Sequence, residues 1–127
     1  MRTYEYHLVV GFEETNLLGN VYFTNFFSWQ GKCREMFLRD HVPNLLQDLR
    51  GELYLVTSRS SCDFYAEVFV FDEIVVRMSL VQLSQSRITM GFDYARLKDG
   101  KEELTARGEQ QVVCMRRHDG KVEVVDV

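Results

Sequence analysis

Two polar residues within residues 15–38, Asn16 and Arg34, are of types that do chemistry in enzymes. The Asn16 amide donates and accepts hydrogen bonds, so it can orient a water molecule or a carbonyl group, but it cannot serve as an ordinary general base. The Arg34 guanidinium can stabilise negative charge that develops on an oxygen during a reaction. Each residue has a structural alternative: Asn16 can simply shape a turn, and Arg34 can pair with an acid such as Glu13 or Glu35.

Other residue types give weaker candidates. Glu13 and Glu14 precede the turn and are expected to be solvated, whereas Glu67 is the carboxylate that we would test as a base. The histidines are isolated from one another, at positions 7, 41 and 118. The cysteines, at positions 33, 62 and 114, stand in apolar or strand contexts that are typical of packing residues. We therefore expect no metal site and no cofactor.

A polar turn and a long helix must position Asn16 and Arg34. The turn ends at Gly19, and the residues after it are strongly apolar: Phe23, Phe26, Phe27, Trp29, Cys33, Met36 and Phe37. A helix with this pattern is apolar around most of its surface, which indicates that it is buried on more than one side.

The ends of this helix are marked by residues with special backbone preferences. Thr24 or Asn25 can cap its start, because a short side-chain oxygen there accepts an otherwise unpaired N–H. Asp40 and Pro43 mark its end, since proline cannot continue the hydrogen-bond ladder. Gly31, in the middle, costs about 1 kcal/mol relative to alanine, so we expect another backbone to approach closely there.

One strand precedes this unit and four or five antiparallel strands follow it. Alternating apolar side chains predict strands over residues 4–12, 53–64, 74–83, 87–97, 104–115 and 121–125, and a short helix over 43–50. Asp99-Gly100 predicts a tight hairpin, because this pair tolerates positive φ angles. The predicted inward faces are Tyr4, Tyr6, Leu8 and Val10, then Tyr54, Val56, Cys62 and Phe64, then Ile74, Val76, Met78 and Leu80, and then Ile88, Met90, Phe92 and Tyr94.

A helix that is apolar nearly all round needs a sheet that curls about it. The expected fold class is therefore α+β, with a curved antiparallel sheet wrapped around one long helix in a single domain over residues 1–127. Val75, Val81 and Val113 fall on outward positions of this sheet. They indicate that a second subunit covers part of it, so we expect a homo-oligomer.

Composition excludes several classes of protein. The chain is 46% apolar and 27% charged, which is ordinary for a globular domain. Its net charge of −4, with both signs scattered, argues against nucleic-acid binding and against a membrane surface. No apolar run approaches the roughly 18 residues that span a bilayer, and the N-terminus lacks a signal-peptide core. The three cysteines lack paired short spacing, so we expect reduced thiols and a cytoplasmic location.

The segment Asn16–Phe26, followed by the aromatic helix with Arg34-Glu35, resembles the signature of hotdog-fold thioesterases of the 4-hydroxybenzoyl-CoA thioesterase type. In that family the pattern runs acid, two small residues, glycine, hydrophobic, aromatic, asparagine, aromatic. The segments 63–66 and 72–74 resemble the family's second and third strands and the turn between them. The resemblance covers essentially the whole chain and implies a hotdog domain.

One departure from the family pattern is informative. The family's catalytic acid position holds Asn16 here, and the second acid position, on the helix, falls near Gly31 and is not acidic either. Together with Arg34 and the segments 62–67 and 71–73, this resembles the branch from enediyne polyketide biosynthesis. Those enzymes release a β-ketoacyl polyene from the acyl carrier protein of an iterative polyketide synthase.

This resemblance implies roles for particular residues. Asn16 would position water or the carbonyl, and Arg34 with backbone N–H groups, from the helix start or near Thr57 and Ser58, would stabilise the oxyanion. The remaining residues expected at the substrate site are Gly19, Tyr22, Phe23, Tyr65 and Glu67, the aromatic ones as walls of an acyl tunnel or, alternatively, as ordinary core residues. The expected partners are a carrier-protein-bound substrate and further copies of the chain, as a dimer or a dimer of dimers.

Two other functions remain open on the sequence alone. One is a general acyl-CoA thioesterase that uses Glu67 or another acid. The other is a non-catalytic acyl-binding domain that has lost its acid.

Overall fold

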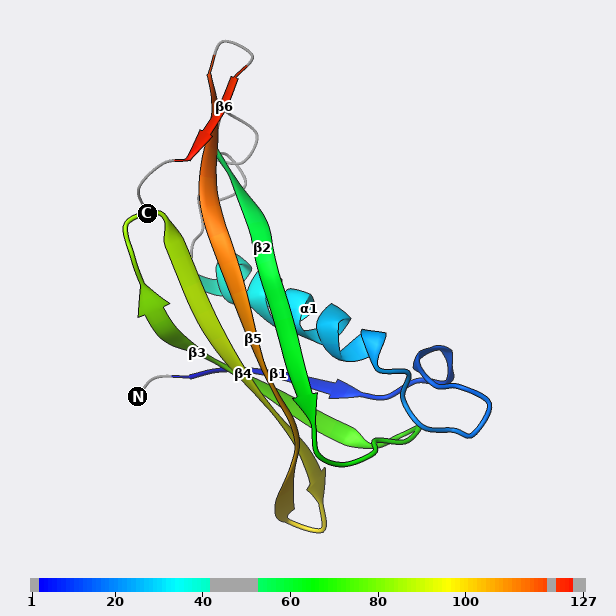
Figure 1. Ribbon diagram of the computed structural model, residues 1–127. Coiled ribbons are helices and arrows are strands. Elements are labelled where there is room, and N and C mark those ends of the chain that lie inside the picture. Colours follow the sequence, from blue (N-terminus) through cyan, green and yellow to red (C-terminus); the bar gives the residue numbers. More distant parts are fainter. Residues whose placement is uncertain (1–2, 42–52, 119–120, 125–127) are drawn as a thin grey trace.

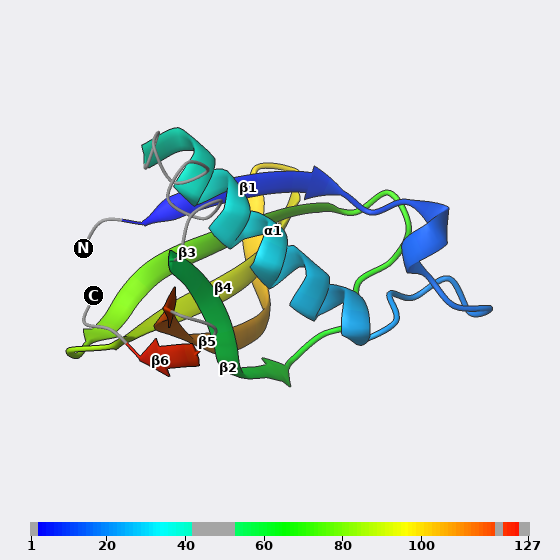
Figure 2. The ribbon, with the colours of Figure 1, turned by 90° about the horizontal axis from the view of Figure 1, so that it is seen from above.

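One long helix, α1 (Thr24–His41), lies across one face of a curved antiparallel sheet (Figure 1). The computed structural model describes residues 3–41, 53–118 and 121–124; the short helix expected over residues 43–50 lies outside this range. Seen from above, the sheet curves beneath the helix along most of its length (Figure 2). The predicted α+β arrangement of one helix and one curved sheet is confirmed.

The sheet has the strand order β1-β3-β4-β5-β2, with β6 paired to β5, and all of its pairs are antiparallel. A short 3-10 helix, η1 (Phe12–Glu14), connects the first strand to the turn before α1. The strands are β1 (Tyr4–Val9), β2 (Leu53–Phe64), β3 (Glu73–Leu83), β4 (Arg87–Lys98), β5 (Lys101–His118) and β6 (Lys121–Val124). These bounds agree with the predicted ranges except at their ends.

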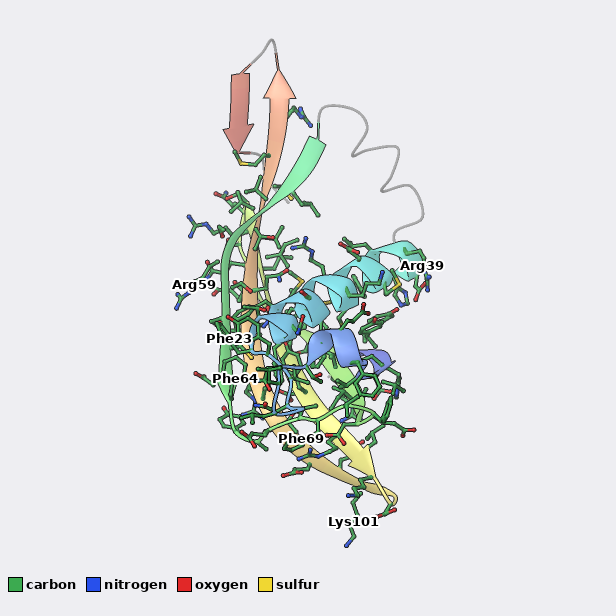
Figure 3. The ribbon with its side chains drawn as sticks, turned by 90° about the vertical axis from the view of Figure 1, so that its right-hand side faces the viewer. Phe23, Arg39, Arg59, Phe64, Phe69 and Lys101 are labelled. Carbon is green, nitrogen blue, oxygen red and sulfur yellow. The ribbon has the colours of Figure 1, made fainter. Side chains whose placement is uncertain are left out.

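The hairpin between β4 and β5 forms as predicted. Asp99 and Gly100 both have positive φ angles, of 53° and 74°, which is the geometry of a primed turn that matches the twist of the flanking strands. Lys101 stands at the tip of this hairpin, at the bottom of Figure 3.

The core lies between α1 and the concave face of the sheet. The predicted inward faces of β1, β3 and β4 are confirmed, since their side chains pack in or against one apolar cluster, apart from Leu80, which is partly exposed. The buried members of this cluster are Val10, Val21, Phe26, Trp29, Cys33, Val68, Ile74, Val76, Met78, Met90, Phe92, Tyr94, Ala106 and Val112.

The prediction for β2 was wrong in its first half. Its register with β5 shifts between Thr57 and Arg59, so Ser58 is an extra residue that forms a β-bulge. Side-chain alternation therefore reverses at the bulge. Leu55, before the bulge, and Cys62, after it, both pack against the core. Val56, predicted inward, is 39% exposed.

The helix buries one face only, which corrects the expectation of burial on most sides. Phe26, Trp29, Gln30 and Cys33 are buried, whereas Phe23 is half exposed. Gly31 has no atom within 4 Å of the position that a Cβ would take. The expected close approach of another backbone is therefore absent from the part of the chain that the structure describes.

The outward valines give less support for a covered face than expected. Val75 and Val113 are buried within the chain itself, although neither belongs to the main core cluster. Val81 is 54% exposed. Of these three valines, only Val81 is therefore exposed enough to contact a second subunit.

Candidate active site

Arg34 projects from the middle of α1 toward β2 and β5, where neutral groups hold it. Its Nη1 donates to the Thr57 hydroxyl at 2.9 Å and to Gln110 Oε1 at 2.6 Å. The bulge at Ser58 makes the first contact possible, because Thr57, directly before it, faces the helix. The structure thus brings together two of the predicted site residues, Arg34 and Thr57.

No carboxylate forms an ion pair with Arg34 in the part of the chain that the structure describes. Among the residues that the structure describes, Arg39, Arg77, Arg96 and Arg107 each form an ion pair with a carboxylate, and Arg34 forms none. Burial lowers the pKa of Arg34, because it removes water from the charged form, and the charge of Glu35 opposes this shift. The Nε atom is buried without a hydrogen-bond partner in the same described set. The structure therefore does not contain the alternative arrangement, an ion pair of Arg34 with Glu13 or Glu35.

Two buried glutamines complete the surroundings of Arg34, and the sequence analysis missed both. Gln30, on α1, donates to the Ser61 carbonyl at 2.9 Å and accepts from the Ser60 hydroxyl at 2.9 Å. Gln110, on β5, lies with its Nε2 3.5 Å from Gln30 Oε1. A signal was present in the sequence: Gln110 alternates with Gly108 and Val112 on one face of its strand, and a polar residue that is buried there needs a partner.

Arg34 also lines a cavity of about 950 Å³ between the C-terminal half of α1 and the sheet. It is the only side chain with a permanent charge among the described residues that line this space. The other lining residues are mostly apolar: Thr3, Tyr4, Phe37, Leu38, His41, Leu55, Met78, Ser79, Leu80, Leu83, Ile88, Met90 and Val112. An apolar cavity of this size with one convergent polar group is typical of a small-molecule site.

Asn16 lies in the turn before α1 and is exposed. Its Oδ1 accepts from Leu18 N at 2.9 Å, its N–H donates to Asn20 O at 2.9 Å, and its carbonyl accepts from Gly19 N at 3.0 Å. The first of these bonds closes an Asx turn, so the turn-shaping role is present in the structure. Arg34 comes ten residues after the helix start, which is about 15 Å along the axis. One chain therefore does not bring Asn16 and Arg34 together.

The remaining predicted residues cluster near the start of the helix. Gly19 has a φ of 86°, which a turn glycine tolerates. Tyr22 and Phe23 have ring centroids 5.0 Å apart, and Phe23 lies 6.4 Å from Phe64 of β2 (Figure 3). Tyr65 follows β2 and is exposed, and none of these aromatic residues lines the cavity. In a single chain, these aromatic residues therefore do not form the wall of an acyl tunnel.

The candidate bases do not lie in the cavity. Glu67 is exposed in the loop between β2 and β3, where its backbone carbonyl accepts from Arg96. Glu14, expected to be solvated, instead accepts from the Trp29 indole at 2.6 Å and from Gly11 N at 3.0 Å. Glu14 therefore anchors the turn to the helix. No group of three or more potential metal ligands occurs in residues 3–41, 53–118 and 121–124, and no helix there is long and apolar enough to cross a membrane.

The fold and this site define a class of protein. The sequence model of the thioesterase-like superfamily matches residues 10–126, so the chain belongs to this superfamily. It is a hotdog-fold thioesterase, an enzyme that hydrolyses thioesters.

Individual solved structures refine this assignment. A structure of the dynemicin thioesterase, which concerns induced-fit and allosteric effects upon polyene binding, is 49% identical, with 99% of this chain and 89% of that chain covered and a TM-score of 0.94. A mutant 4-hydroxybenzoyl-CoA thioesterase complexed with 4-hydroxybenzoyl-CoA is 16% identical, over 100% and 94% of the two chains, at a TM-score of 0.87. A 1,4-dihydroxy-2-naphthoyl-CoA thioesterase from Synechocystis is 23% identical, with 97% of this chain and 89% of that chain covered and a TM-score of 0.81.

The last two similarities show the fold alone. No curated protein sequence matches the chain. The resemblance inferred from residues 16–35, to hotdog thioesterases and their enediyne branch, is confirmed.

Proposed function

We propose that this thioesterase hydrolyses a long, polyunsaturated β-ketoacyl thioester carried by the acyl carrier protein of an iterative enediyne polyketide synthase. The observation that carries the proposal is the unneutralised Arg34 guanidinium in the wall of a large apolar cavity. The cavity suits a long apolar chain, and the charge suits the thioester end. Similarity to a thioesterase that binds a polyene supports the same substrate class.

The reaction proceeds by attack of water on the thioester carbonyl carbon. The carbonyl oxygen becomes an oxyanion, which Arg34 and backbone N–H groups stabilise; one such donor contributes about 3 kcal/mol. The C–S bond then breaks, the leaving sulfur takes up the proton that the attacking water gives up, and a β-keto acid remains. Because the β-keto group makes the carbonyl more electrophilic, no carboxylate base or nucleophile is needed. The β-keto acid then loses CO₂.

The site is completed by a second copy of the chain. Asn16 lies in the turn before the start of α1, and Arg34 lies about 15 Å along the helix from that start, so the Asn16 that positions water or the carbonyl comes from the neighbouring subunit. The β2 strand supports this assembly: it is a long edge of the sheet, which an isolated protein would normally protect. The exposed aromatic residue Phe64 ends this strand, and the exposed Phe23 lies beside Phe64 (Figure 3). We propose a dimer, or a dimer of dimers, in the cytoplasm.

The test compares a β-ketoacyl thioester with the matched saturated acyl thioester, both on a pantetheine handle and then on a carrier protein. Wild type, Asn16→Ala and Arg34→Ala are assayed, with Arg107→Ala as the control. Arg107 is an exposed arginine on the outer face of β5 that pairs with Asp93. The control removes an arginine that lies away from the cavity.

We expect a strong preference for the β-keto substrate. Arg34→Ala lowers kcat by about 10²–10³-fold, as loss of an oxyanion donor does; Asn16→Ala also lowers kcat, and Arg107→Ala does not. Equal turnover of the saturated ester, with Asn16→Ala unaffected, would instead indicate a general acyl-CoA thioesterase. Binding of both esters without turnover would contradict the proposed reaction.

A further inference from the structure

We propose that Gln110, itself oriented by Gln30, is a positioning residue that holds the Arg34 guanidinium toward the substrate and leaves its charge unneutralised. The inference rests on the proposed role of Arg34 in stabilising the oxyanion. It adds two residues, on different elements, to the machinery of the site.

The hydrogen bonds fix the direction of both amides. The Ser61 carbonyl can only accept, so it must face the NH₂ of Gln30, with 2.9 Å between the atoms. The Gln30 oxygen then points the other way and accepts from Ser60 at 2.9 Å. Gln110 turns its NH₂ to that oxygen, at 3.5 Å, and so presents its own oxygen to Arg34 Nη1 at 2.6 Å. A backbone carbonyl of β2 thus determines which atom Arg34 meets.

Strand β5 has a glycine, Gly108, where the Gln30 side chain approaches it. A Cβ on Gly108 would lie 2.2 Å from Gln30 Nε2 and 2.6 Å from the Ser61 carbonyl oxygen. Glycine inside a strand weakens it and often marks a close approach of another group. Here the group is the Gln30 side chain, which is completely buried, as Gln110 very nearly is.

Gln110 is neutral, and this matters for the proposed role of Arg34. A carboxylate in its place would also accept from Arg34, but it would pair the charge that the oxyanion needs. Thr57, the other acceptor, is neutral as well. The two acceptors restrict the rotamers of Arg34, while its net positive charge stays available to the cavity.

The decisive variant is Gln110→Glu, which keeps the size of the side chain and an acceptor for Arg34. Gln111→Glu is the matched control: it adds the same charge one residue further along β5, where the side chain faces away from the helix. Both are assayed for kcat, KM and their pH dependence on the β-ketoacyl pantetheine thioester, beside Gln110→Met, which removes the acceptor without adding charge.

We expect Gln110→Glu to lower kcat at least about tenfold, up to the 10²–10³-fold effect of one oxyanion donor, with KM little changed. The rate should recover as the pH falls and the introduced carboxylate becomes protonated, a pH limb that wild type and Gln111→Glu lack. Gln110→Met should lower kcat at every pH. Unchanged kcat in both Gln110 variants would overturn the inference.

The Arg34→Ala background separates this inference from the function that it rests on. There, Gln110→Glu should cause no further loss of rate, because the group that Gln110 positions is gone. If Arg34→Ala itself keeps full kcat, the proposed function fails. If Arg34→Ala loses rate but both Gln110 variants keep it, only the positioning role fails.

Discussion

Replacement of Gly108 by alanine tests the packing on which the Arg34 site depends. The added Cβ would lie 2.2 Å from Gln30 Nε2 and 2.6 Å from the Ser61 carbonyl oxygen, whereas ordinary contacts begin at 3.4 Å. Gln30 would have to retreat by about 1 Å, and the β2 backbone by nearly as much. The side chain can do so only by giving up its hydrogen bond to Ser61.

The cost follows from these two effects. Overpacking of a well-filled interior destabilises by about 1–3 kcal/mol, and the lost hydrogen bond adds about 1 kcal/mol. Gly108→Ala should therefore lower the free energy of unfolding by about 2–4 kcal/mol, a large share of the 5–15 kcal/mol typical of a domain. Its kcat should fall too, since a displaced Gln30 no longer orients Gln110.

The assay is urea unfolding followed by the fluorescence of Trp29, the only tryptophan. Gly11→Ala is the control: Gly11 has an ordinary φ of −97°, and the nearest atom to its added Cβ lies at 3.9 Å. That variant should stay within about 0.5 kcal/mol of wild type. A Gly108→Ala protein with wild-type stability and wild-type kcat would refute the reasoning.

Three further predictions concern stability. Gly31→Ala should stabilise the chain by up to about 1 kcal/mol in urea unfolding, because alanine favours helix and no atom lies within 4 Å; destabilisation would place another backbone there. Burial raises the pKa of Cys33 to about 12 and that of Cys62 to about 11 from 9.0; the folded state favours the neutral thiols, so stability should fall above pH 9 and less steeply after Cys→Ala replacement. Glu14→Ala should cost about 1–3 kcal/mol and shift the Trp29 emission, because the indole N–H loses its charged acceptor; an unshifted spectrum would contradict this.

Periodicity predicted the elements of this fold because side-chain alternation holds over long stretches of the strands, even where β3 and β5 carry a bulge. The alternation in β1, β3 and β4 identified the correct inward faces, and Asp99-Gly100 identified the hairpin. β2 failed because a bulge changes the phase of the alternation, and Ser58 carries no sequence signal that separates an extra residue from a paired one. A one-residue shift of this kind reverses the faces of the side chains on one side of the bulge relative to those on the other side.

The helix failed for a different reason. Its aromatic residues made it look apolar on most sides, yet Phe23 is half exposed and Phe27 only partly buried. Hydropathy does not distinguish a side chain buried in its own domain from one that is buried by a second copy. The same ambiguity explains why Val75 and Val113 were assigned to an interface, although the chain covers both itself.

Arg34 was singled out as a guanidinium on a helix expected to be buried and through the family resemblance, but its partners were not predicted. The expected partners were substrate, Asn16 or an acid, since a buried arginine usually has a structural partner. The structure contains neutral acceptors instead, one of them placed by a bulge and the other by a chain of two amides. Such partners are defined by three-dimensional contacts across α1, β2 and β5, which no local spacing encodes.

The choice of neutral partners is consistent with the proposed reaction, in which Asn16 stands where the family resemblance would place a catalytic acid. Without a carboxylate to attack or to deprotonate water, more of the barrier must be lowered by stabilising the oxyanion, and that stabilisation depends on the charge available at the carbonyl. A carboxylate paired with Arg34 would neutralise the guanidinium in the free enzyme. During the reaction it would also compete with the oxyanion for the hydrogen bonds of Arg34. In the proposed reaction, an asparagine in place of the acid and an Arg34 that forms no ion pair are therefore two parts of one electrostatic arrangement. Restoring an acid at position 16 and adding one at position 110 should have opposite effects on kcat, and measurement of both single variants on the same β-ketoacyl thioester would test that arrangement directly.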